Sequence, residues 1–96
     1  MPTDDRQAAA EKVAALLELL RKTPGPGTAA IIEEGEALAR AIAAFHLEGI
    51  RFRIFNVDRL LSHGSTVPDG APALLEDARR HLEAAGFHTR SHQAPG

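Results

Sequence analysis

The sequence contains no cysteine, no tryptophan and no tyrosine, and it has a single methionine. Without cysteine the chain can form no disulfide, can offer no thiolate to a zinc ion and has no cysteine nucleophile. The missing thiols therefore remove several classes of site before any motif is considered. The remaining aromatic residues are four phenylalanines.

Long apolar runs and an export signal are also missing. Nowhere do roughly 18 apolar residues follow one another, as a membrane-spanning helix requires. The first five residues, Met-Pro-Thr-Asp-Asp, lack the basic-then-apolar order of a signal peptide. The sequence thus predicts a soluble, cytoplasmic protein with no membrane partner. Its length of 96 residues predicts a single domain over 1–96, with an ordered core at about 3–91 and a flexible tail at 93–96.

The net charge of −2 is distributed unevenly between the two halves. Residues 1–50 hold eight acidic and five basic side chains, a net charge of −3. Residues 51–96 hold six arginines and five acids, a net charge of +1, together with four of the five histidines. Mild acidification would make this second half more cationic. Ordinary surface solvation explains the asymmetry, and a functional cationic face is the alternative.

Two helices are predicted in the first half. From Thr3, a capping residue, to Lys22 the apolar side chains recur at spacings of three and four. The segment 23–27, Thr-Pro-Gly-Pro-Gly, should end this helix, because proline lacks a backbone N–H and glycine readily takes positive φ. Such a short break favours an antiparallel helical hairpin. The second helix is predicted from Thr28, as its cap, to about Leu47, with Gly49 available to end it.

A ridge of small residues follows one side of this second helix. Gly35, Ala39 and Ala43 are spaced by four, so they lie on one face and allow another helix to approach closely. Glycine inside a helix costs about 1 kcal/mol relative to alanine. We therefore expect the ridge to serve helix packing or dimerisation, and neutral drift at Gly35 is the alternative.

The segment 48–58 alternates apolar and polar residues with a two-residue period. Ile50, Phe52 and Ile54 would lie on one face of a β-strand, with Arg51 and Arg53 on the other. The alternation predicts a strand surrounded by helices.

The last third predicts a loop, a helix and a second strand. Residues 58–70 are rich in turn-forming residues, and a helix should run from about Pro72 to just before Gly86. A short polar strand is expected over 87–92. The predicted fold is therefore α+β, in the order α-α-β-α-β, with a small two-stranded sheet. Its open edges favour pairing with a second copy of the chain.

No motif predicts catalysis, a metal or a cofactor. The glycine-containing segments lack the strand–glycine–helix context of a phosphate-binding loop. His88 and His92 would share a strand face, but they have no third ligand and Arg90 would repel a cation between them. Ser65 and His63 are too close in sequence for triad geometry.

The sequence therefore favours a small non-enzymatic interaction or regulatory module that acts as a homodimer or binds another protein. The first alternative is nucleic-acid or polyanion binding through one basic face of the sheet, formed by Arg51, Arg53, His88, Arg90 and His92. The second is a small enzyme or ligand-binding protein that uses the 58–70 loop, with Asp58, Arg59, His63, Ser65 and Thr66 as its polar candidates.

Overall fold

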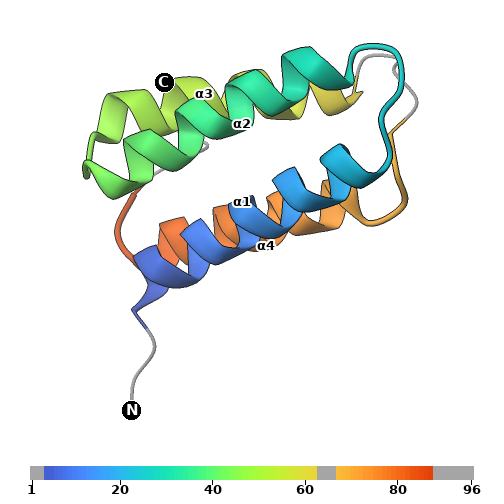
Figure 1. Ribbon diagram of the computed structural model, residues 1–96. Coiled ribbons are helices and arrows are strands. Elements are labelled where there is room, and N and C mark those ends of the chain that lie inside the picture. Colours follow the sequence, from blue (N-terminus) through green and yellow to red (C-terminus); the bar gives the residue numbers. More distant parts are fainter. Residues whose placement is uncertain (1–3, 63–66, 88–96) are drawn as a thin grey trace.

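The computed structural model describes residues 4–62 and 67–87, which form four α-helices (Figure 1). The helices are α1 (Asp5–Lys22), α2 (Thr28–Ala43), α3 (Leu47–Ser62) and α4 (Ala71–Ala84). Neither described stretch contains a strand. The predicted α+β fold with its two-stranded sheet is therefore wrong, and the described chain is all-helical.

The predicted N-terminal helical hairpin is confirmed. The first helix starts after Asp4, whose carboxylate accepts a hydrogen bond from the backbone N–H of Arg6 at 3.0 Å. The second starts after Gly27, which takes a left-handed conformation at φ 81°. Thr28 is therefore not the cap of this helix as predicted, and its hydroxyl instead accepts from the backbone N–H of Gly25 at 2.9 Å. The short connection 23–27 makes α1 and α2 antiparallel (Figure 1).

The end of α2 differs from the prediction. The helix stops at Ala43 rather than near Leu47, because Phe45 takes a left-handed conformation with φ 57°. The backbone N–H of Phe45 donates to the carbonyl of Ile42 at 3.1 Å, and the next N–H donates to the carbonyl of Ala41 at 3.0 Å. This pair of bonds is a Schellman helix end, which usually has glycine at the left-handed position.

His46 joins this helix end directly to the start of α3. Its ring Nδ1 accepts a hydrogen bond from the backbone N–H of Gly49 at 2.8 Å, as an N-cap side chain does. Gly49 therefore lies in the first turn of α3 and does not end α2 as predicted. The connection that reverses the chain between α2 and α3, including the cap of α3, therefore takes only three residues, 44–46.

The segment predicted as the first strand is helix α3. Ile50 and Ile54 satisfy a two-residue period and a helical period equally well, because they are four positions apart. Val57 and Leu61 continue the helical spacing, and all four are buried. In the predicted strand, Phe52 would share one buried face with Ile50 and Ile54, but Phe52 is 56% exposed. The buried stripe extends over about three turns, from residue 50 to residue 61, and so defines a helix. The strand alternation fails within this segment, because it requires Phe52 to be buried.

The fourth helix agrees with the prediction of a helix from about Pro72 to before Gly86. Pro72 lies in its first turn, and Gly86 at φ 100° provides a second Schellman end. The N–H of Phe87 donates to the carbonyl of Leu82 at 2.9 Å. Phe87 is therefore part of a helix end and not of a strand, and residues 88–92 of the predicted second strand lie outside the described residues.

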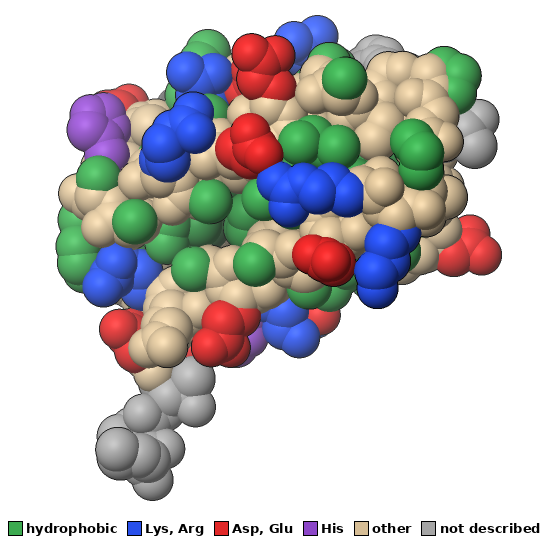
Figure 2. Space-filling view, in the orientation of Figure 1, with side chains coloured by type: hydrophobic (Ala, Val, Ile, Leu, Met, Phe, Trp, Pro, Cys, Tyr) green, Lys and Arg blue, Asp and Glu red, His purple; other side chains and the backbone are tan. Residues whose placement is uncertain are grey.

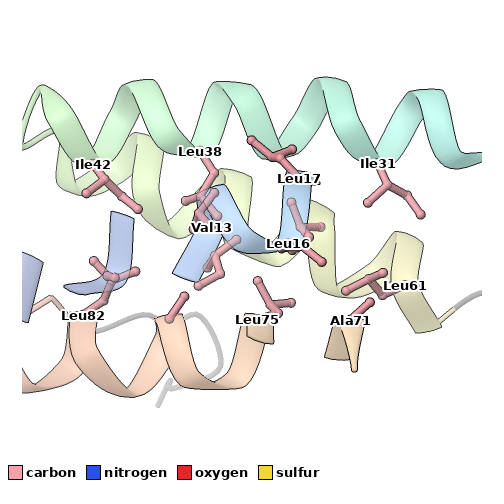
Figure 3. Packing of buried hydrophobic residues seen from close by; sticks show 14 of the residues in the cluster. Val13, Leu16, Leu17, Ile31, Leu38, Ile42, Leu61, Ala71, Leu75 and Leu82 are labelled. Carbon is pink, nitrogen blue, oxygen red and sulfur yellow. The ribbon is translucent and has the colours of Figure 1, made fainter. Parts of the chain in front are cut away.

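The four helices run up, down, up and down around one core (Figure 1). The closest pairs are α1 with α4 and α2 with α3, α1 also packs on α2, and α3 meets α4 less extensively. Figure 3 shows Val13 and Leu16 of α1 between Leu38 of α2 and Leu75 of α4. These side chains belong to one buried hydrophobic cluster to which every helix contributes. No helix in the described part of the chain is long and apolar enough to cross a membrane.

Candidate interaction surface

Large hydrophobic side chains that remain exposed are concentrated in one short segment. Among the described residues they are Phe45, Leu47, Phe52 and Phe55. Their concentration within 11 residues differs from the scattered single apolar residues that are normal on a protein surface. The segment comprises the α2–α3 corner and the first half of α3.

Phe52 and Phe55 project from the side of α3 opposite its buried stripe. We use the name outer face of α3 for Glu48, Phe52, Phe55 and Arg59, which share one side of the helix at spacings of four, three and four. Phe52 and Phe55 are 56% and 44% exposed, and Arg59 is also exposed. The Glu48 side chain is 78% exposed and lies 3.5 Å from Arg51. The outer face therefore has an aromatic centre between an acidic and a basic end.

A polar cluster anchors one flank of α3 to α2. Arg53 Nη1 donates to both carboxylate oxygens of Glu34 at 3.0 and 3.2 Å, and Asn56 Nδ2 donates to Oε1 at 3.1 Å. Burial alone would raise the pKa of the Glu34 carboxyl, but the bonds from Asn56 and Arg53 and the charges of Arg53 and Arg59 outweigh it. The pKa of Glu34 therefore lies below its ordinary value of 4.5.

The other flank of α3 is anchored to α4. Asp58 Oδ2 lies 3.9 Å from Arg79 Nη2, and the Arg79 side chain is only 12% exposed. Contacts on both flanks and the buried stripe between them set the rotation of α3 about its axis. The outer face of α3 is consequently kept exposed to solvent.

The α2–α3 corner carries a second aromatic group. The guanidinium carbon of Arg6 lies 3.9 Å from the centre of the Phe45 ring, and the ring of Phe87 lies 6.1 Å from it. Arg6 also donates from Nη1 to the carbonyl of Ile42 at 3.2 Å, at the negative end of α2. These contacts hold the side chain of Phe45 against Arg6 of α1 and against Phe87, which follows α4, although the backbone of Phe45 is strained.

The predicted basic face is not assembled as the sequence suggested. Arg51 and Arg53 are two positions apart on a helix, about 160° around its axis, and not on one strand face. Each lies beside an acid, Arg51 beside Glu48 and Arg53 beside Glu34. The other three members, His88, Arg90 and His92, lie outside the described residues.

The predicted ligand loop begins later than expected. Asp58 and Arg59 belong to α3, which extends to Ser62, so the 58–70 segment is not one long loop. The remaining candidates, His63, Ser65 and Thr66, lie outside the described residues.

Of the three small residues in the predicted ridge of α2, only Gly35 is shown in close contact with α1. Gly35 is buried, and a Cβ built on it would lie 2.7 Å from Leu17 Cδ2. Ala39 is half-buried and packs on the core, whereas Ala43 is exposed. The ridge thus serves, at Gly35, a close contact between two helices of the same chain.

The face formed by α1 and α2 carries charges of both signs. Figure 2 shows acidic and basic side chains spread over it, with hydrophobic side chains along the line between the two helices. Arg21 and Glu36 form an ion pair across this line, with Nη2 2.6 Å from Oε2. This face therefore has no concentration of positive charge that would favour a polyanion.

The outer face of α3 differs from the sequence prediction, in which the strand alternation places Phe52 in the core. In a helix, the spacing of residues 48, 52, 55 and 59 puts these residues on one side. Neither a pocket nor a metal-binding group of side chains occurs in the described residues. Comparisons with protein-family models, curated proteins and solved structures give no match.

Proposed function

We propose that this protein is a small protein-interaction module that acts as a homodimer through the outer face of α3. The observation that carries the proposal is the exposure of Phe52 and Phe55 on one side of a helix whose other three sides are held by the bundle. Burying exposed apolar area contributes about 25 cal/mol per Å². Aromatic side chains supply much of that energy at interfaces.

The contacts around α3 support this role for a second reason. The ion pairs to Glu34 and Arg79 orient the helix before any partner binds. A surface that is already ordered loses less conformational entropy on association than a flexible one. The outer face of α3 is thus prepared for docking.

The test is the mass of the protein in solution. Light scattering after size exclusion, at about 100 μM, well above the dissociation constant of a micromolar complex, should give a dimer. Phe52→Glu should shift the protein to monomer, because it places two carboxylates in the apolar centre of the contact. Phe52→Leu is the matched control that keeps an apolar side chain, and circular dichroism should show equal helix content in all three proteins. A wild-type protein that stays monomeric at this concentration would refute the proposal.

A further inference from the structure

The outer face of α3 has the spacing of a helix–helix seam. Residues 48, 52, 55 and 59 are separated by four, three and four positions, which is the alternation of the two seam positions in a coiled coil. The buried residues Ile50 and Ile54 lie on the opposite side of the helix. One helix thus has two separate apolar sides, one inside its own bundle and one outside.

Side chains at equal distances on either side of the midpoint of this seam are complementary to each other. The seam reads acid, aromatic, aromatic, base, and its midpoint falls between residues 53 and 54. A two-fold axis at this point would bring Glu48 of one copy opposite Arg59 of the other, and Phe52 opposite Phe55. Self-complementarity of this kind is what an interface between two identical subunits requires.

The edge of the seam shows the same complementarity. Arg51 and Asp58, one basic and one acidic, are seven positions apart and so flank the seam on the same side of the helix, the side on which Asp58 meets Arg79 of α4. An antiparallel second helix brings Arg51 of one copy near Asp58 of the other. A parallel helix would instead bring Glu48 onto Glu48 and Arg59 onto Arg59, which is unfavourable.

We infer that two copies of this chain pair through antiparallel α3 helices, with Glu48 of each copy bound to Arg59 of the other around a centre of four phenylalanines. The inference rests on the proposed homodimer and adds its partner residues and its orientation. A single helix pair buries an area at the low end of specific interfaces. The dimer is therefore weak, with a dissociation constant on the order of micromolar.

Charge exchange tests the pairing. Glu48→Arg and Arg59→Glu should each weaken self-association roughly tenfold, because each replaces two attractive pairs with two repulsive ones. The double variant Glu48→Arg/Arg59→Glu should restore the wild-type affinity. Residues 48 and 59 lie about 16 Å apart along one helix, too far to pair within a chain. Restoration would therefore report a contact between copies.

A cross-linking experiment tests the orientation, and the natural absence of cysteine makes it clean. Glu48→Cys and Arg59→Cys, each alone, should cross-link poorly with a short thiol-specific reagent. A mixture of the two variants should cross-link efficiently, because only an antiparallel pair brings residue 48 to residue 59. Lys12→Cys, on α1 and away from the outer face of α3, is the control site in such mixtures.

The outcomes separate this inference from the proposed function. In one outcome, Phe52→Glu disrupts the dimer but the charge-exchange variants do not change its affinity. In the same outcome, the Glu48→Cys variant cross-links neither with itself nor with the Arg59→Cys variant. That result would overturn the pairing and leave the homodimer. Efficient cross-linking of Glu48→Cys with itself would establish a parallel pair and also overturn the inference. A wild-type monomer would overturn both the homodimer and the antiparallel pairing.

Discussion

Gly35→Ala tests a close contact between α1 and α2, because it adds one methyl group to a buried position of α2. A Cβ at this position would lie 2.7 Å from Leu17 Cδ2 and 3.6 Å from Leu17 Cγ. The first distance is well inside van der Waals contact, and Leu17 is itself only 6% exposed. The added methyl group therefore forces the end of the Leu17 side chain to move within a packed core.

Two effects of opposite sign decide the result. Alanine is favoured over glycine inside a helix by about 1 kcal/mol. Overpacking a core costs about 1 to 3 kcal/mol when neighbouring side chains must leave their preferred rotamers. We expect the packing cost to be larger, so that Gly35→Ala lowers the free energy of unfolding by about 1 kcal/mol. Leu17→Ala alone should lower it by about 2 to 5 kcal/mol.

The double variant isolates the contact. In the Leu17→Ala background the obstructing atoms are gone, so Gly35→Ala should raise the free energy of unfolding by up to about 1 kcal/mol. Urea unfolding followed by circular dichroism measures all four proteins. Ala37→Gly, inside the same helix, is the control for helix propensity and should cost about 1 kcal/mol. A stabilising Gly35→Ala in the wild-type background would refute the steric argument.

Two further predictions concern α3. The pKa of Glu34 is lowered in the folded protein, so its contribution to stability is complete above about pH 4.5 and is lost as the pH falls through the folded-state value. Urea unfolding at several pH values should show that Glu34→Gln destabilises the protein at about pH 7 and has less effect in acid; equal effects at both would contradict this. Ile54→Ala should cost about 2 to 5 kcal/mol, whereas Phe52→Ala should cost less than about 1 kcal/mol in dilute protein, because only Ile54 is fully buried. If thermal unfolding shows that the two variants lose equal stability, Phe52 is buried like Ile54, as the predicted strand requires.

Short apolar patterns explain where sequence reasoning succeeded and where it failed. The first, second and fourth helices were predictable, because their apolar side chains repeat over three or more turns between proline- and glycine-rich breaks. The third was mistaken for a strand because β-branched and aromatic residues are frequent in strands, and Ile50, Phe52 and Ile54 alternate over a short window. Val57 and Leu61 would have favoured the helix had the window been longer.

The end of α2 shows a limit of local reasoning. Glycine is the usual residue at a left-handed helix end, so the sequence predicts that Gly49 ends this helix. The structure places the turn at Phe45, where Arg6 and Phe87 contact the ring. Those partners lie 39 and 42 positions away in the sequence, and a local pattern contains no information about them.

The sequence by itself determined three of the four helices and the short connection that makes the first two antiparallel, because these depend on neighbouring residues. Only the tertiary structure decided which side of α3 is buried. Both sides of that helix are apolar, so hydrophobicity alone does not choose between them. The choice follows from the fit of Ile50, Ile54 and Val57 into the shared core and from the polar anchors to Glu34 and Arg79. The same contacts leave Phe52 and Phe55 exposed on the outer face of α3.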